Sequence, residues 1–139
     1  MRCLLDTCVI SELTTKIPNP KVVEYLDALD PGSTFLSVIS IGEIQKGISK
    51  MPSSKRKTQL RQWFNDFLLV RFSQNLLDVD VRTMLVWGDL RAELESKGRP
   101  MSTLDSVIAA QARLHDQTLV TRNVNDFAGA GVQIENPWR

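Results

Sequence analysis

The chain has few of the residues on which several common kinds of protein depend. It contains two cysteines, Cys3 and Cys8, and a single histidine, His115. These side chains cannot supply the four Cys and His ligands of the usual structural zinc site. A Ser-His-Asp or Cys-His mechanism would depend on His115 alone, and no nucleophile-elbow motif accompanies it. Any chemistry is therefore expected from carboxylates and a metal ion rather than from a covalent intermediate.

The chain also lacks a strong charge of either sign and a long hydrophobic run. Seventeen basic and sixteen acidic side chains give a net charge of +1, so any affinity for nucleic acid must come from a local patch. No apolar run approaches the roughly 18 residues of a membrane span, and Asp6 interrupts the first run too early for a signal peptide. We expect a cytoplasmic protein that has no contact with a membrane. Its 139 residues, of which 42% are hydrophobic, predict one domain over residues 1–139.

The N-terminal stretch contains the first candidate functional residue. Cys3 to Leu5 form an apolar run typical of a buried strand, and Asp6 and Thr7 end it. Asp6 would therefore lie at the carboxyl end of the first strand, the edge at which open parallel sheets bind ligands. Either Asp6 or Thr7 can alternatively serve as the N-cap of the following helix. For Asp6 alone, the capping role is the simpler interpretation.

The rest of the chain predicts short strands that alternate with helices. After residues 3–5, we expect strands at 34–37, 76–79, 118–121 and 132–135, and helices at 20–29, 38–50, 55–70, 80–96 and 103–114. This alternation implies an α/β fold, with a short and mostly parallel sheet between layers of helices.

Acidic side chains follow successive strands or open helices of this predicted sheet. They are Asp6, Glu43, Asp105 and Asp126, and Asn123 lies close to the last of them. Clustered carboxylates raise each other's pKa unless a cation compensates their charge. Oxygen ligands without thiolate or imidazole favour Mg²⁺ or Mn²⁺, and such ions support water attack on a phosphodiester. The residues alone thus predict metal-dependent phosphate chemistry.

Each of these acidic residues also has a purely structural interpretation. Ser40 to Glu43 fits a capping box in which Glu43 would reach back to the Ser40 amide, so cap and ligand are equally good interpretations. Ser102 and Asp105 resemble a second capping box. Asp126 would either complete the acidic site or cap the turn that follows it, and the cap is slightly favoured.

Two further patterns leave a structural and a functional interpretation open. A cluster of positive charge is a solvated face or a phosphate-binding patch; it comprises Lys46, Lys50, Lys55, Arg56, Lys57 and Arg61. An amphipathic stripe belongs to the core or forms a partner surface; it comprises Leu60, Trp63, Phe64, Phe67 and Leu68. The segment 80–96 has so wide an apolar face that we expect burial on more than one side, within the domain or against another subunit.

Four segments carry a resemblance to a known family. They are LDTCVISE (5–12), SIGE (40–43), LDSVIA (104–109) and VTRNVNDF (120–127). In order and spacing they resemble the successive motifs of the PIN-domain family, and more narrowly of the VapC/FitB-type ribonuclease toxins of type II toxin–antitoxin systems. The resemblance extends over essentially the whole chain, including the closing Asn136-Pro137-Trp138.

The resemblance implies an α/β/α sandwich and an endoribonuclease that uses Mg²⁺ or Mn²⁺ and a metal-activated water. Asp6, Glu43 and Asp105 match the family's catalytic acidic metal site, and Thr7 matches a hydroxyl that supports it. At the fourth position some members have Asp where this chain has Asn123, so Asn123 or Asp126 would complete the metal site. Cys8 replaces the usual Asn, which alters the surroundings of the metal ligands. Lys46, Lys50 and Arg122 are candidate RNA-binding residues.

The resemblance also implies partners. It predicts a homodimer and a cognate VapB/FitA-like antitoxin, assembled with it as a hetero-tetramer or hetero-octamer. In the family, the antitoxin's C-terminal segment blocks the site and its N-terminal domain binds operator DNA. Nothing in this chain resembles a DNA-binding module, so we expect no direct contact with DNA. The RNA that is cut cannot be inferred from metal-site residues, because these contact the backbone.

Two functions are alternatives to a ribonuclease. A receiver-type phospho-acceptor domain needs an acidic pair after the first strand and a lysine near the end of a late strand. This chain has Asp6 alone and no lysine after Lys97, which disfavours that function. A non-catalytic PIN-like scaffold that binds proteins is opposed by the three intact acidic positions, whereas Asn123 favours it.

Overall fold

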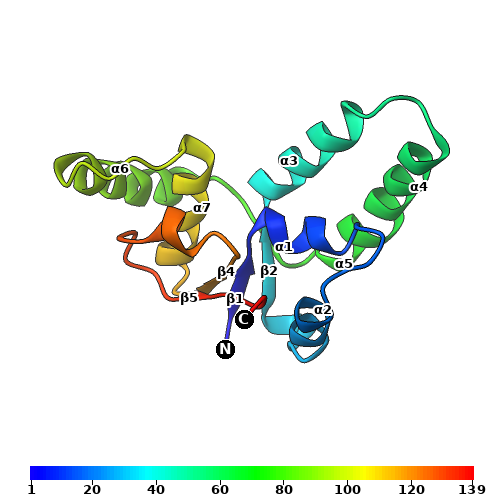
Figure 1. Cartoon of the computed structure of the whole chain (residues 1–139). Coiled ribbons are helices and arrows are strands. Elements are labelled where there is room, and N and C mark those ends of the chain that lie inside the picture. The colour runs from blue at the N-terminus through cyan, green and yellow to red at the C-terminus, as the bar shows by residue number, and fades with distance from the viewer.

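The sheet consists of five parallel strands in the order β3-β2-β1-β4-β5 (Figure 1). A computed structural model describes residues 1–139. The strands are β1 (Cys3–Leu5), β2 (Thr34–Ser37), β3 (Leu76–Leu77), β4 (Thr118–Val120) and β5 (Ile134–Glu135). All four pairings between neighbouring strands are parallel. The predicted parallel α/β fold is therefore confirmed.

Helices cover both faces of this sheet (Figure 1). One layer contains α1 (Thr7–Glu12), α2 (Pro20–Asp27), α3 (Val38–Ser49), α4 (Lys55–Trp63) and α5 (Leu69–Arg71). The other contains α6 (Val81–Ser96) and α7 (Thr103–Leu114), which pack against each other. Short 3₁₀ turns, η1 (Pro31–Ser33) and η3 (Val124–Phe127), complete the chain. No helix combines the length and the apolar composition that a membrane crossing requires.

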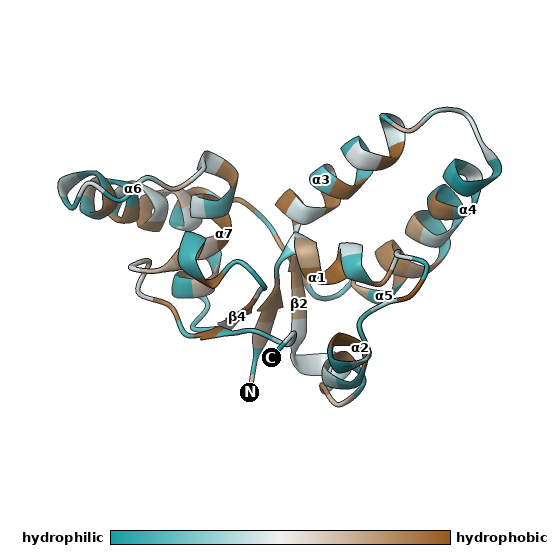
Figure 2. Cartoon of the chain, in the orientation of Figure 1, coloured by the Kyte–Doolittle hydropathy of each residue, from teal (hydrophilic) through white to brown (hydrophobic).

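The strands bury both faces because their residues point alternately to the two layers. Cys3 and Leu5 belong to a core cluster shared with α1, α2 and α3. Leu4 belongs to a second cluster, in which Leu90 of α6 and Ile108 of α7 are fully buried. The hydrophobic colour in Figure 2 is accordingly concentrated on the central strands. A strand that is buried on both sides needs the unbroken apolar run found here.

The position of β1 creates the crevice that matters for function. β1 pairs with β2 on one side and with β4 on the other. The chain leaves these strands towards opposite layers, so the carboxyl ends of β1 and β4 lie at a topological switch point, where open α/β sheets bind ligands. The backbone amide of Asp6 donates to the carbonyl of Val120 across this point, at 2.9 Å.

The outer strands are shorter than the sequence predicts. β3 ends at Leu77 rather than Val79, and β5 begins at Ile134 rather than Val132. Each is an edge strand with a single partner, and pairing covers only two residues in each case. Next to β5, the Gln133 carbonyl still accepts the Leu119 amide at 2.8 Å, but the pairing extends no further towards Val132. Asp80 instead caps α6, where its carboxylate accepts the Thr83 amide at 2.9 Å.

The helix predicted over 55–70 is interrupted by a π-helical turn, η2 (Phe64–Leu68). The wider turn divides the apolar stripe. Phe64 and Leu68 are buried, whereas Phe67 is 54% exposed and its ring stacks on that of Trp63. The core interpretation of the stripe is thus confirmed for Phe64 and Leu68, whereas Phe67 lies on the surface.

Candidate active site

Asp6 is held in place at the carboxyl end of β1. Its Oδ1 accepts a hydrogen bond from the Thr7 amide at 2.8 Å, which makes it the N-cap of α1. Its Oδ2 accepts the hydroxyl of Thr121 at 2.8 Å. The residue is 4% exposed. The capping interpretation is therefore right, and it does not compete with a functional role, because one carboxylate oxygen serves the cap and the other faces β4.

Thr121 is a site residue that the sequence did not reveal. It is fully buried directly after β4 and bridges two parts of the site, donating to Asp6 and accepting the Asn123 amide at 3.0 Å. The loop after β4 is thereby tied to Asp6. The only signal in the sequence was its position at the end of a predicted strand on the same edge as Asp6, which the predicted strand 118–121 concealed.

Cys8 also lies against Asp6. Its sulfur is 3.6 Å from Asp6 Oδ2 and 3.6 Å from the Thr121 hydroxyl oxygen. Burial, and then the Asp6 carboxylate, raise the pKa of the Cys8 thiol, so the side chain stays protonated and can donate weakly to Asp6. The residue that replaces the family's usual asparagine thus contacts the carboxylate directly.

Glu43 is brought to the same edge by a hydroxyl pair. The hydroxyl of Thr7 donates to Glu43 Oε1 at 2.7 Å and lies 2.7 Å from the hydroxyl of the buried Ser40. These contacts join α1 to α3, although 36 positions separate Thr7 from Glu43. The supporting position predicted for Thr7 is therefore next to an acidic residue of the site.

The capping box predicted for Ser40 and Glu43 is wrong. α3 begins at Val38, and its N-cap is Ser37, whose hydroxyl accepts the Ile39 amide at 3.0 Å. Because β2 runs directly into α3, Ser37 takes the cap and Ser40 lies inside the helix. Glu43 then lies beyond the first turn, where its carboxylate faces Thr7.

Asp105 opens α7 near the same carboxylates. The Ser102 hydroxyl accepts the Asp105 amide at 3.2 Å, which confirms Ser102 as the cap of this helix. Burial raises the pKa of the Asp105 carboxyl, the Ser102 hydroxyl opposes that increase, and the charges of Asp6, Glu43 and Asp126 raise the pKa further. Four carboxylates therefore influence one another electrostatically at this edge.

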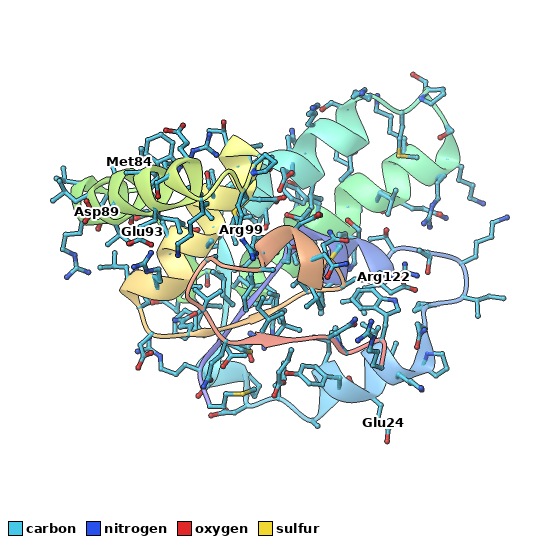
Figure 3. The ribbon with its side chains drawn as sticks, turned by 60° about the vertical axis from the view of Figure 1, so that its left-hand side comes forward. Glu24, Met84, Asp89, Glu93, Arg99 and Arg122 are labelled. Atoms are coloured by element: carbon cyan, nitrogen blue, oxygen red, sulfur yellow. The ribbon has the colours of Figure 1, made fainter.

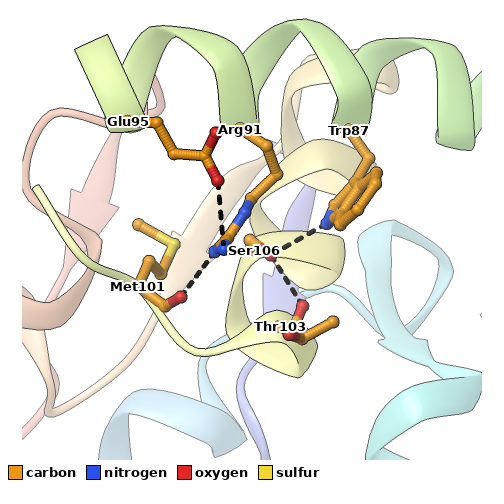
Figure 4. A network of polar contacts seen from close by, with 6 residues as sticks. All are labelled: Trp87, Arg91, Glu95, Met101, Thr103 and Ser106. Carbon is orange, nitrogen blue, oxygen red and sulfur yellow. Dashed lines mark hydrogen bonds and ion pairs between the residues drawn. The ribbon is translucent and has the colours of Figure 1, made fainter. Parts of the chain in front are cut away.

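A polar network on α6 fixes the start of α7 (Figure 4). The Trp87 indole donates to the Ser106 hydroxyl at 2.9 Å, which donates to the Thr103 carbonyl at 2.7 Å. Arg91 donates to the Met101 carbonyl at 2.6 Å. The backbone that carries Asp105 is thus anchored to α6.

The loop after β4 carries the remaining predicted residues. Asn123 precedes η3 without making a side-chain cap bond. The carboxylate of Asp126 accepts no hydrogen bond, and the Ala128 amide at the end of η3 bonds to a backbone carbonyl, so the predicted capping role of Asp126 is wrong. The Arg122 guanidinium lies 5.3 Å from the centre of the Trp138 ring (Figure 3).

A groove of about 450 Å³ lies beside Glu43, between α3 and the start of α7, and Lys46 and Lys50 line it. The acidic side chains, by contrast, are close without converging fully. The structure contains no group of three His, Cys, Asp or Glu side chains spaced to hold a metal ion.

The fold and this edge define a parallel α/β domain with buried and partly buried carboxylates at its switch point. The chain belongs to the PIN domain family, whose sequence profile matches residues 3–131.

Relatives of similar length have names that describe toxins and nucleases. The chain is 36% identical to the plasmid stability protein StbB of Pseudomonas syringae pv. tomato, over 97% of each chain. It is 33% identical to the toxin FitB of Neisseria gonorrhoeae, over 97% of each. It is also 33% identical to the VapC ribonuclease Y4jK of Sinorhizobium fredii, over 97% of this chain and 96% of the relative.

Solved structures agree with these relationships. FitAcB from Neisseria gonorrhoeae superimposes with a TM-score of 0.94 at 32% identity, over 99% of both chains. FitAB bound to a DNA fragment superimposes with a TM-score of 0.94 at 32% identity, over 99% of this chain and 96% of the other.

Proposed function

We propose that this chain is the ribonuclease toxin of a toxin–antitoxin pair and that it hydrolyses RNA at the acidic edge of its sheet. The observation that carries the proposal is that Thr7 bonds to both Asp6 and Glu43, and that the charges of these two carboxylates act on Asp105, from a third part of the chain. Relatives named as a VapC ribonuclease and a toxin support it.

The chemistry of the donor set suits a divalent cation, which would have to draw the three carboxylates closer together than they lie in this structure. It offers carboxylate oxygens, and the pKa of Asp105 is raised first by burial and then by the charges of Asp6, Glu43 and Asp126. Mg²⁺ or Mn²⁺ suits such oxygen ligands, and we propose that Asp6, Glu43 and Asp105 hold the ion, with Asn123 or Asp126 completing the set. The ion would neutralise charge and activate water for attack on the phosphodiester.

The chain's own residues orient the site and bind the substrate. Thr121 and the Thr7 amide fix the two oxygens of Asp6, so that its carboxylate keeps one orientation. Lys46 and Lys50, in the groove beside Glu43, attract the RNA backbone. Arg122, on the loop after β4, offers a further cation, although its guanidinium lies against the Trp138 ring.

Cleavage of total cellular RNA by purified protein tests this function. Wild type, Asp6→Asn and Asp105→Asn are compared in Mg²⁺, in Mn²⁺ and in EDTA. Glu24→Gln is a matched control, since this exposed acid lies on α2 away from the acidic edge (Figure 3). We expect discrete fragments from wild type and Glu24→Gln, only with metal, and none from the other two variants.

The same experiment identifies the alternative function. If wild type and all variants are equally inert while folded and while binding Mn²⁺, the chain is a non-catalytic PIN-like scaffold. If the fragments persist in EDTA, the metal-dependent mechanism is wrong. A receiver-type function requires phosphorylation of Asp6, which incubation with acetyl phosphate and mass spectrometry would detect.

We further propose that a cognate VapB/FitA-like antitoxin binds beside the site. A hollow of about 210 Å³ between α1, α3 and α4 is lined by apolar side chains, including Ile10, Ile44 and Trp63, and reaches Glu43. A partner segment seated there would end at the acidic residues. Co-purification and inhibition of RNA cleavage test this, and Trp63→Ala should weaken both. The chain alone is predicted to leave DNA unshifted in a gel.

We also propose a homodimer formed through α6. Its residues Val81 and Leu85 are 76% and 67% exposed, and Met84 beside them is 40% exposed (Figure 3). Such an apolar face on a helix indicates a partner. Light scattering should give a dimer for wild type and a monomer for Leu85→Arg. Val70→Arg, at a residue of equal exposure on α5, should remain dimeric. Hetero-tetramer or hetero-octamer assembly with the antitoxin is measured in the same way.

A further inference from the structure

The groove beside Glu43 has the size of a ligand site. Its volume is about 450 Å³, within the roughly 300–1,000 Å³ typical of small-molecule pockets. Its walls come from one side of α3 and from Leu104, the neighbour of Asp105 at the start of α7. The groove therefore adjoins two of the acidic residues at which RNA cleavage is proposed.

The two parts of this groove differ in character. Val38, Ile39 and Leu104 form an apolar part, and Leu104 is 46% exposed although it is a large hydrophobic residue. Lys46 and Lys50 form a cationic part; they lie four positions apart and hence on one side of the helix. Neither lysine makes an ion pair within the chain. Both charges are available to a ligand.

Two glycines keep the groove open. Gly42 and Gly47 line it, and a Cβ atom built on either would meet no atom within 4 Å. Neither has the positive φ that favours glycine, and glycine is less favourable than alanine inside a helix. Neither the backbone nor internal packing therefore requires glycine here. Its effect is to leave space between the apolar part and the lysines.

We propose that this groove binds the nucleotide next to the scissile bond, with its base on Val38, Ile39 and Leu104 and its phosphate at Lys46 and Lys50. This inference rests on the proposed ribonuclease function. An apolar surface accepts the face of a base that is unstacked from single-stranded RNA, and the unpaired lysines complement the phosphate. A ligand that is both flat and anionic matches this combination. The groove would thus contribute base preference beside the cut.

Filling the groove tests the proposal without disturbing the acidic residues. Gly42→Phe places a ring in the groove, whereas Gln45→Phe places the same ring at an exposed position of α3 that does not line it. Leu104→Ala removes part of the apolar surface without adding bulk, and it serves should Gly42→Phe not fold by circular dichroism. A Lys46→Ala/Lys50→Ala double variant removes the cations.

Two readouts are compared. The first is the affinity for a fluorescein-labelled ten-nucleotide single-stranded RNA of mixed sequence, measured in EDTA by anisotropy over a range of salt. We expect Gly42→Phe and Leu104→Ala to lose at least about tenfold in affinity with an unchanged salt slope. The double lysine variant should lower the slope by about 0.7, since both lysines are proposed to contact the same phosphate and each single-strand phosphate contact contributes about 0.7. Gln45→Phe should match wild type.

The second readout is the sequence around the cuts in total RNA. Gly42→Phe and Leu104→Ala should lose or change base preference at one position flanking the cut. Unchanged affinity and unchanged cut sites in both variants would overturn the proposal. So would loss of antitoxin binding with RNA binding intact, since the groove would then be a protein-docking surface. A wild type that neither binds nor cuts RNA would instead refute the proposed function itself.

Discussion

The acidic edge consists of two parts that are built differently. Asp6 and Glu43 accept hydrogen bonds from the side chains of Thr7 and Thr121, which hold the carboxylates in fixed orientations. Asp105 and Asp126 lie on α7 and η3, and their positions come from backbone and packing. The carboxylates of the first part are thus oriented by hydroxyl donors, whereas those of the second part accept no such bond.

This difference indicates a division of labour. In the first part, hydroxyl donors fix the orientation of the Asp6 and Glu43 carboxylates. For Asp105, burial and three neighbouring carboxylates disfavour ionisation. A bound cation should therefore stabilise the ionised carboxylate of Asp105 in particular. Substitutions in the two parts should differ in their effects on activity and stability.

Asp105→Asn should lower the rate of RNA cleavage at least about 100-fold. The same substitution should stabilise the metal-free fold at neutral pH. Because the pKa of Asp105 is raised in the folded state, the fold binds more protons than the unfolded chain above the ordinary carboxyl pKa, and wild-type stability falls as pH rises through the raised value. In EDTA the Tm of Asp105→Asn should exceed that of wild type at pH 7 and converge with it below about pH 4. A lower Tm at pH 7 would contradict the contrast.

Thr121→Val should reduce activity and Mn²⁺ affinity by about 10- to 100-fold, the usual effect of removing a hydrogen-bond partner of a ligand. It leaves Oδ2 of buried Asp6 with the Cys8 thiol alone. Thr121→Ser keeps the hydroxyl and should restore both values, which a purely steric role would not predict. Calorimetry with Mn²⁺ and RNA cleavage measure the two quantities. Equal Mn²⁺ affinity in Thr121→Val and wild type would contradict the role assigned to this hydroxyl.

Ser106→Ala should have a smaller effect, because it acts on the backbone that carries Asp105. It removes the link between the Trp87 indole and the Thr103 carbonyl and should cost about 1–3 kcal/mol in the free energy of unfolding. Urea denaturation measures this. Cleavage should fall by less than in Thr121→Val, and a larger fall would place the critical support on the α7 side.

Cys8→Ala should have the smallest effect, about 1 kcal/mol or less, since the sulfur contacts at 3.6 Å are long and weak. The raised pKa of the Cys8 thiol predicts slow reaction with iodoacetamide at pH 8. Mass spectrometry follows that reaction, with the protein unfolded in urea as the fast reference. Equally fast modification of the folded protein would show that the thiol is not shielded by Asp6 and burial.

The sequence predicted correctly those features that depend on a few consecutive residues. The apolar run Cys3–Leu5 and the cap at Ser102 are confirmed. The PIN-domain resemblance is confirmed as well. The errors lie at the ends of the edge strands, at the π-helical turn within 55–70, and where one residue had two local interpretations. Glu43 was compatible with a capping box until the end of β2 gave the cap to Ser37.

By itself, the sequence determined the order of elements, because hydrophobic periodicity is a local property. The alternation of strands and helices then predicted the parallel sheet, and the positions of the acidic residues after strands or at helix starts predicted their place at its carboxyl edge. The tertiary structure alone decided which side chains support those acids. The bonds of Thr121 to Asp6 and of Thr7 to Glu43 span 115 and 36 positions. They exist because β4 lies beside β1 and α1 lies against α3, and no local pattern encodes such contacts.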